Sequence, residues 1–301
     1  MSGAHGHRLT RRGLLGAGAG LGALAVLAGC GAAEPSSPGA SSGGASSGGA
    51  DSADEGVDRV YYGSDRDHQF VDVRRPSGRA LGTVALIHGG YWQAGYGLDL
   101  MNALANRFTA LGHVTWNIEY RSVGAGGGWP TTFTDVAAAL DRIPRETDVP
   151  GEVVLLGHSA GGHLAGWAAS RSARTPGGAP ALTPRSAISL SGLLDLSAAA
   201  EAPQSAGPTR SLMGGTPAQQ PDRYALGDPT LLVPAACPVV AVQATQETVI
   251  PTDQSASYAA KAEAAGGRVT QVALEGDHFT LIDPTHPSFA RLQQLVTRAL
   301  A

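Results

Sequence analysis

Residues 152–163 read Glu-Val-Val-Leu-Leu-Gly-His-Ser-Ala-Gly-Gly-His, an apolar run that leads directly into Gly157-His158-Ser159-Ala160-Gly161. The run is typical of a strand buried on both faces, and the small residues after Ser159 favour a helix packed on a sheet. A G-x-S-x-G sequence between such elements places the serine at a sharp turn, with its Oγ clear of the sheet. The glycines are needed because a side chain at either position would crowd the turn. This stretch predicts a nucleophilic serine at position 159.

The five-residue pattern is informative only in this context. It also occurs at residues 39–43 and 44–48, but both copies lie in a Ser- and Gly-rich tract that cannot form a strand, a turn and a helix. At Ser159 the alternative is an ordinary glycine-rich corner between a strand and a helix. The apolar run before Ser159, with Leu164 and Trp167 after it, favours the nucleophile.

Apolar runs and helical patterns alternate along the rest of the chain. We expect strands at residues 84–87, 114–118, 153–156, 187–190, 239–242 and 269–274, and helices at residues 98–111, 134–143, 160–171, 255–265 and 288–299. This alternation predicts an α/β fold, with a mostly parallel central sheet and helices on both faces. Residues 197–232 interrupt the pattern. We expect them to form a small insertion at the top of the sheet that shapes the pocket.

A histidine is needed to take the proton of the serine, and a carboxylate to stabilise the imidazolium. In this type of fold the order along the chain is serine, acid, histidine. His278 lies between the last expected strand and the last helix, where a loop can reach over the sheet toward Ser159. We therefore expect His278 to be the base, with His286 as the other downstream histidine. His158 and His163, beside the serine, are expected to pack or to bond locally.

The acid is expected on the loop after the strand at residues 239–242. Glu247 is the only carboxylate in residues 243–251, and glutamate is an accepted third member of such a triad. Asp195, after an earlier strand, and Asp253, further along the same loop, are the alternatives. Asp277 adjoins His278 and is poorly placed to bond its ring.

His88-Gly89-Gly90-Tyr91-Trp92 follows the first apolar run and supplies candidates for an oxyanion hole. Backbone N–H groups usually stabilise the oxyanion in serine catalysis. We expect the donors to be the N–H groups of Gly90, Tyr91 and Ala160. His88 is expected to hold this loop rather than to act as a second base, and the side chains of Tyr91 and Trp92 to face the substrate or to pack beneath the loop.

Three segments together resemble the α/β-hydrolase superfamily: residues 88–92, residues 157–163 and Gly276-Asp277-His278-Phe279. Within that superfamily they resemble the branch of kynurenine formamidase-like enzymes and small carboxylesterases. The resemblance includes residues 117–121 and 128–130 and covers nearly all of residues 60–300. It implies the α/β-hydrolase fold and a serine hydrolase. One departure lies on the acid loop, where that family has His-Gly-x-x-Asp and this chain has Gln243-Ala244-x-x-Glu247.

Residues 1–29 have the layout of a signal peptide. Arg8, Arg11 and Arg12 precede an uncharged, glycine-rich apolar stretch, and residues 10–15 resemble a twin-arginine export signal. Leu-Ala-Gly-Cys at residues 27–30 resembles a bacterial lipobox, which implies cleavage before Cys30 and acylation of Cys30. We expect an extracytoplasmic lipoprotein anchored to the cell membrane. Plain secretion and a retained transmembrane helix are the alternatives.

Residues 30–56 consist almost wholly of small residues and proline, and are expected to be a flexible tether before a hydrolase domain at residues 57–301. Cys237 is expected to be a buried apolar residue and to form no disulfide. Without the three signal-peptide arginines the chain has 18 basic and 25 acidic residues, a net charge of −7, which disfavours nucleic-acid binding. No metal, phosphate-binding or redox motif is present in the sequence, so no cofactor is expected.

The motifs predict a carboxylesterase-like serine hydrolase that cleaves ester or aryl-amide bonds of small substrates through an acyl-enzyme. A kynurenine formamidase-type amidase and a peptidase of the same superfamily are the alternatives among enzymes. An exported enzyme has little need for an intracellular step of tryptophan breakdown, which favours the esterase. A non-catalytic binding lipoprotein on a hydrolase scaffold is the alternative from another class. Such proteins typically lose the serine or the histidine, and both are present here.

Overall fold

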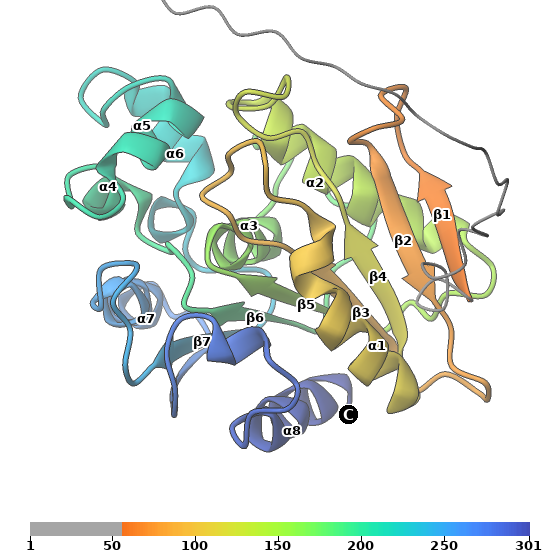
Figure 1. The fold of residues 1–301 in the computed structure, drawn as a ribbon. Helices are drawn as coiled ribbons and strands as arrows, with labels where there is room; N and C mark the ends of the chain where they lie inside the picture. The colour runs from red at the N-terminus through yellow and green to blue at the C-terminus, as the bar shows by residue number, and fades with distance from the viewer. Residues whose placement is uncertain (1–55) are drawn as a thin grey trace, which may run out of the picture. The chain divides into compact units, whose positions relative to one another are not determined.

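A computed structural model describes residues 56–301, and an eight-stranded sheet runs through their centre (Figure 1). The strand order is β1-β2-β4-β3-β5-β6-β7-β8. The strands are β1 Val57–Tyr61, β2 Phe70–Arg74, β3 Thr83–Ile87, β4 Val114–Ile118, β5 Val153–His158, β6 Ser186–Leu190, β7 Val239–Ala244 and β8 Val269–Leu274. Pairing is antiparallel from β1 to β4 and parallel from β4 to β8. The expected signal peptide, Cys30 and nearly all of the expected tether lie outside the described residues.

The sequence patterns predict six of these strands, and the structure adds the hairpin of β1 and β2. Charged residues interrupt the apolar pattern here, so neither segment reads as a buried run. In the hairpin Arg59 lies directly opposite Asp72, and the two side chains form an ion pair at 2.7 Å. Asp72 and Arg74 of β2 are buried, and Arg74 donates to the side chain of Asn102 at 2.9 Å. Pairing of this kind makes charged residues acceptable in a buried strand, and it is not visible in the sequence.

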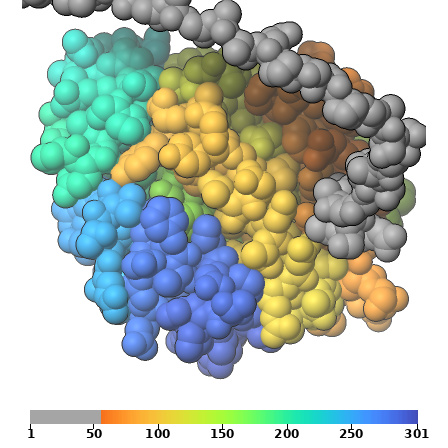
Figure 2. Space-filling view, viewed as in Figure 1, coloured from red at the N-terminus to blue at the C-terminus, as the bar shows by residue number. Residues whose placement is uncertain are grey.

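Helices cover both faces of the sheet. The helices are α1 Asn102–Ala110, α2 Thr131–Arg142, α3 Ala160–Ala169, α4 Leu196–Ala199, α5 Ala206–Met213, α6 Pro221–Gly227, α7 Gln254–Ala264 and α8 Phe289–Leu300. α1 and α8 pack on one face, where Phe108 and Phe289 are in ring contact at 5.5 Å, and their surfaces adjoin in Figure 2. α2, α3 and α7 pack on the other face. Alternate residues of β3 belong to the two cores, as expected of a strand buried on both faces.

The predicted insertion is a group of short helices between β6 and β7. It contains α4, α5 and α6, which lie together beside α3 in Figure 1. Two side chains of α3 hold it: His163 Nε2 bonds the carbonyl of Gly227 at 2.9 Å, and Trp167 Nε1 donates to the carbonyl of Leu226 at 3.0 Å. The insertion is therefore fastened to the helix that follows Ser159.

Among the described residues, no helix combines the length and the apolar character that a bilayer crossing requires.

Candidate active site

Ser159 sits at the turn between β5 and α3 in a strained backbone conformation. Its φ of 55° and ψ of −119° are unusual for a residue with a side chain. A β-carbon at Gly157 would lie 2.0 Å from the carbonyl oxygen of Gly161, and one at Gly161 would lie 2.0 Å from that of Ile87. The backbone N–H of Ser159 donates to Leu190 of the neighbouring strand at 2.8 Å. Only glycine fits on either side of this turn.

Glu247 and His278 form a buried pair. The Oε2 atom of Glu247 lies 2.8 Å from Nδ1 of His278, and the Oε1 atom accepts the N–H groups of Val249 and Ile250 at 2.9 and 3.3 Å. Burial raises the pKa of Glu247, but hydrogen bonds from His278 and Ser191 outweigh it and lower the pKa to about 2. Glu247 is therefore a carboxylate at neutral pH, placed to stabilise a positive charge on His278.

Ser159 and His278 line one pocket of about 120 Å³. Among the described residues, neither a carbonyl nor a ring nitrogen accepts a hydrogen bond from the Ser159 hydroxyl. Catalytic hydrogen bonds are often long in unliganded enzymes and tighten when substrate binds. The rest of the lining is mostly apolar and consists of Gly90, Tyr91, Tyr96, Leu100, His158, Val249, Phe279 and Ile282. The site thus combines a serine, an imidazole and a carboxylate with a small apolar cavity.

The other candidate acids lie in different surroundings. Asp195 caps the start of α4, and its carboxylate forms an ion pair with Lys261 at 2.7 Å. Asp253 is exposed at the start of α7. Asp277 accepts the backbone N–H groups of Phe279 and Thr280, both at 2.9 Å, and so points back into its own turn. Of the carboxylates considered, Glu247 is the one bonded to the His278 ring.

The remaining histidines have structural contacts. His158 bonds the carbonyl oxygen of His278 through Nε2 at 2.9 Å and therefore supports the distant loop that carries His278, a wider role than the local one expected. Burial, with the neighbouring His278, lowers the pKa of His158 to about 3 and keeps this ring neutral. His286 bonds Ser288 two residues away.

The loop after β3 closely approaches the turn at Ser159. Gly90, Tyr91 and Trp92 have φ values of 100°, 53° and 56°, and Nε1 of the buried Trp92 donates to the carbonyl of Ala160 at 3.1 Å. Among the described residues, no acceptor is bonded to the backbone N–H groups of Gly90, Tyr91 and Ala160. Gly90 and Tyr91 line the pocket, and Ala160 directly follows Ser159, so these three N–H groups remain the candidates for oxyanion donors. Of the two possibilities for the aromatic side chains, Tyr91 lines the pocket and Trp92 packs beneath the loop.

Glu119 supports this loop, a role that the sequence patterns do not predict. Its carboxylate bonds Nε2 of His88 at 3.1 Å and accepts the N–H of Leu98 at 2.8 Å. His88 thus holds the loop, as expected. Its position in the sequence could have indicated this role. Glu119 is a carboxylate directly after the expected strand at residues 114–118, and site residues gather after strands in this class of fold.

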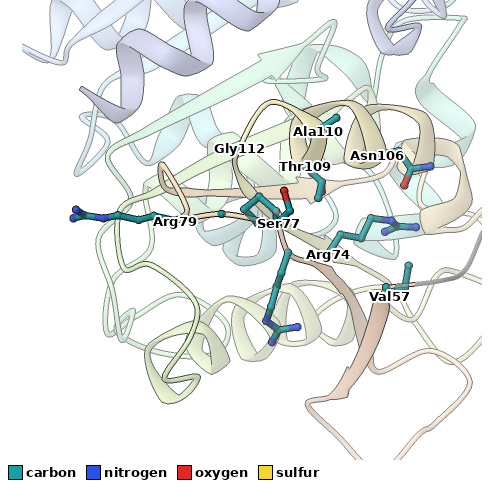
Figure 3. A pocket seen from close by; sticks show the side chains of 12 residues that line it. Val57, Arg74, Ser77, Arg79, Asn106, Thr109, Ala110 and Gly112 are labelled. Carbon is teal, nitrogen blue, oxygen red and sulfur yellow. The ribbon is translucent and has the colours of Figure 1, made fainter.

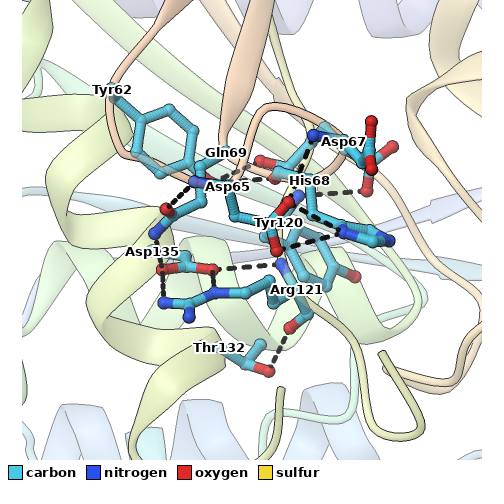
Figure 4. A network of polar contacts seen from close by, with 10 residues as sticks. Tyr62, Asp65, Asp67, His68, Gln69, Tyr120, Arg121, Thr132 and Asp135 are labelled. Atoms are coloured by element: carbon cyan, nitrogen blue, oxygen red, sulfur yellow. Dashed lines mark hydrogen bonds and ion pairs between the residues drawn. The ribbon is translucent and has the colours of Figure 1, made fainter. Parts of the chain in front are cut away.

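A polar network fixes the segment around Glu119 (Figure 4). Tyr62 donates to the carbonyl of Glu119 at 2.7 Å. Arg121 forms a bidentate ion pair with Asp135, with distances of 2.7 and 2.8 Å. Gln69 also donates to Asp135, at 2.8 Å. The residues that follow β1 and precede β2 are thereby joined to α2 and, through Glu119, to the loop after β3.

The insertion does not line the pocket, contrary to the expectation from sequence. The lining residues follow β3, β5, β7 and β8, and none comes from residues 197–232. The physical reason is its attachment to α3 through His163 and Trp167. Its contact with the site is indirect, through a hydrogen bond at 3.2 Å from the Tyr91 hydroxyl to the carbonyl of Gln204.

Across residues 56–301 no group of three or more His, Cys, Asp or Glu side chains is arranged to hold a metal ion. Cys237 is buried, and burial raises the pKa of its thiol to about 11.

Comparison with known proteins identifies the domain. The profile of the BD-FAE family matches residues 71–262. No curated protein matches the sequence.

Solved structures of esterases share the fold. A truncated carbohydrate esterase from gut microbiota superposes with a TM-score of 0.70 at 20% identity, over 80% of this chain and 95% of that chain. Esterase B from Lactobacillus rhamnosis HN001 gives 0.68 at 18% identity, over 82% and 86%. The thermophilic esterase Est2 from Thermogutta terrifontis gives 0.63 at 20% identity, over 82% and 92%. At these identities the likeness concerns the fold, which is the α/β-hydrolase fold.

Proposed function

The chain belongs to the BD-FAE family, and from that premise we propose that it is a serine carboxylesterase with Ser159 as nucleophile, His278 as general base and Glu247 as the acid of the triad. The observation that carries the proposal is the 2.8 Å bond between Glu247 and His278 at the pocket that also contains Ser159. A binding protein without catalysis has no need for a buried carboxylate bonded to an imidazole that shares a pocket with a serine.

The proposed reaction has two half-reactions. Ser159 Oγ attacks the ester carbonyl while His278 Nε2 takes the hydroxyl proton, and Glu247 stabilises the imidazolium through Nδ1. The N–H groups of Gly90, Tyr91 and Ala160 bind the oxyanion. The alcohol leaves with the proton from His278, and water, activated by the same imidazole, then releases the acid from the acyl-enzyme.

The size of the pocket supports short acyl groups as substrates. A cavity of about 120 Å³ is well below the roughly 300–1,000 Å³ of sites that bury a drug-sized ligand. Leu100 and Ile282 are among the residues that line it. We therefore expect acetate and butyrate esters to be cleaved faster than octanoate or longer esters.

Labelling of the serine tests the central claim. A fluorophosphonate probe should modify Ser159, and Ser159→Ala should abolish labelling and lower kcat by roughly 10⁵-fold or more, since triad members act as a unit. A melting curve like that of the unmodified protein shows that the variant is folded. Labelling of a different serine, or turnover by the folded variant, contradicts the proposal.

A substrate series separates the esterase from the formamidase. The motif around His88 resembles kynurenine formamidase-like enzymes, and this supports aryl-formamides as the second candidate substrates. p-Nitrophenyl esters of graded length and N-formylkynurenine would be compared by kcat/KM. A higher kcat/KM for N-formylkynurenine than for every ester would reverse our order of preference, with the serine mechanism unchanged.

We also propose that the chain is a membrane-anchored lipoprotein, exported by the twin-arginine route and acylated at Cys30. The support is the sequence of residues 1–30 alone. Cys30→Ala should release the protein to the medium or leave its signal uncut, and replacing Arg11 and Arg12 by lysine should block export. Membrane-bound protein with a cut signal in the Cys30 variant would place the anchor elsewhere.

A further inference from the structure

The edge of the sheet opposite the active site has a distinct surface. Ser159, Glu247 and His278 all follow the carboxyl ends of strands, whereas the segments that lead into the parallel strands lie at the other edge. Three hollows of about 410, 300 and 400 Å³ adjoin there. The first and second meet at Leu111 and Gly112, and the second and third at Ala299 and Leu300. We call this surface the amino-end face and define it by Arg79, Leu81, Arg185, Arg268, Arg298 and Leu300.

The amino-end face carries a surplus of positive charge. Its four arginines are exposed, and within residues 56–301 none of them forms an ion pair. In Figure 3 Arg79 extends away from Arg74 at the rim of the first hollow. The acidic side chains of the same edge are largely used: Asp58 and Asp148 pair with Arg75, and Glu146 pairs with Arg142. At this edge of the sheet, Glu152 and Glu263 are exposed and have no ion pair. The surplus stands out on a chain whose mature form carries a net charge of −7.

The amino-end face also has an exposed apolar side chain. Leu81 is 66% exposed, more than any other large apolar residue among those described, and it lines the second hollow with Leu111 and Leu300. An exposed leucine on a face that also carries four exposed arginines suits the boundary of a bilayer, where apolar groups enter the acyl region and guanidinium groups bind phosphates.

The chain enters the domain at this same face. Gly56, the first described residue, lines the first hollow beside Arg74 and Arg79. The segment that carries Cys30 therefore joins the domain next to the arginines rather than next to the pocket of Ser159.

We propose that the amino-end face docks on an anionic lipid surface, with Leu81 in the interface and Arg79, Arg185, Arg268 and Arg298 on headgroup phosphates. The Ser159 pocket then faces away from the membrane, open to substrates in solution. The orientation is independent of the reaction catalysed. Each arginine near an anionic membrane favours docking by about five-fold.

Energy transfer on the full chain tests this orientation. A fluorophore on Ser77→Cys, at the amino-end face, is compared with one on Ser211→Cys, on the insertion at the carboxyl ends of the strands. Both serines are exposed, and Cys237 is buried. The protein is reconstituted in vesicles of phosphatidylglycerol and phosphatidylcholine that contain a headgroup-labelled acceptor lipid. We expect transfer several-fold stronger from position 77 than from position 211, and loss of this difference in pure phosphatidylcholine.

Charge reversal makes the test specific. Arg79→Glu with Arg185→Glu and Arg298→Glu should weaken docking by roughly 100-fold or more and abolish the difference between the two positions, while ester hydrolysis and the melting temperature stay unchanged. If this variant does not fold, about 0.5 M salt on the unmodified protein should remove the same difference. Equal transfer from both positions in anionic vesicles, or a difference that persists after charge reversal or in salt, overturns the proposal. Loss of the anchor is a separate result, because the protein then leaves the vesicles altogether.

Discussion

Ser159 lines the pocket and Glu247 bonds His278 behind it, and the segments that carry these two residues are held by different means. The turn at Ser159 is held by backbone packing, because Gly157 and Gly161 leave no room for a side chain. The loop of Glu247 is held by polar contacts: its carboxylate accepts the N–H of Val249, and the Tyr91 hydroxyl donates to the carbonyl of Val249 at 2.8 Å. The serine is thus placed by local geometry, and the acid by contacts with residues far away in the chain.

Beyond the loss of the serine itself, the largest expected effect is at the proposed acid. Glu247→Gln should lower kcat by roughly 10²- to 10⁴-fold, because it removes the charge that stabilises the His278 imidazolium. Glu247→Asp keeps the charge, loses only reach and should be much milder. Asp195→Asn and Asp253→Asn are the matched controls, measured at the same pH with melting curves. If Asp195→Asn or Asp253→Asn strongly lowers kcat while Glu247→Gln leaves it nearly unchanged, the acid of the triad is a different carboxylate.

The second prediction concerns the turn at Ser159. Gly161→Ala places a β-carbon against the carbonyl oxygen of Ile87, on backbone that cannot move aside, and should cost about 3 kcal/mol or more of unfolding free energy. Gly207→Ala in α5 is the control, since a β-carbon there meets no atom within 4 Å. Urea unfolding of both variants measures the difference. Equal stability would mean that the turn is more adaptable than its geometry implies.

The third prediction uses pH. Burial lowers the pKa of His163 from 6.5 to about 4, although its bond to Gly227 opposes this. The unfolded chain therefore binds a proton near pH 6.5 and the folded chain only near pH 4, so stability is lost as pH falls through this interval, by about 3 kcal/mol. His163→Gln, which can still donate to Gly227, should reduce the loss in thermal melts by the share of His163, while the share of the buried His158 remains. His68→Gln, at a half-buried surface position, is the control and should leave the loss of stability unchanged.

The smallest expected effect concerns the link between the two loops. Tyr91→Phe removes the hydroxyl bonded to Val249 and Gln204 but keeps the ring and the backbone donor, so kcat should fall by about ten-fold or less. The same assay on Tyr96→Phe, another tyrosine at the pocket, is the control. A fall as large as that of Glu247→Gln would give the tyrosine hydroxyl a part in the chemistry.

Much of the sheet could be predicted because β3 to β8 are short apolar runs between helical patterns. β8 coincides with the expected strand, and α3, α7 and α8 begin within one residue of expectation. β1 and β2 could not be predicted from apolar periodicity, because their charged residues are acceptable only as cross-strand partners, as with Arg59 and Asp72. The predicted helix at residues 98–111 begins instead as a 3₁₀ segment, Leu98–Met101, where the side chain of Glu119 binds the N–H of Leu98.

The amino-acid order alone was enough to predict the sharp turn at Ser159, because a glycine-flanked serine between an apolar strand and a helix admits few other backbone conformations. It also narrowed the acid and the base to a few residues through their order along the chain. The folded arrangement was needed to show which carboxylate bonds His278, that Glu119 and His158 support the loops of the site, and that the insertion packs on α3 instead of lining the pocket. The reason is that these contacts join residues about 30 to 120 positions apart, and their partners depend on which strand ends meet at one edge of the sheet.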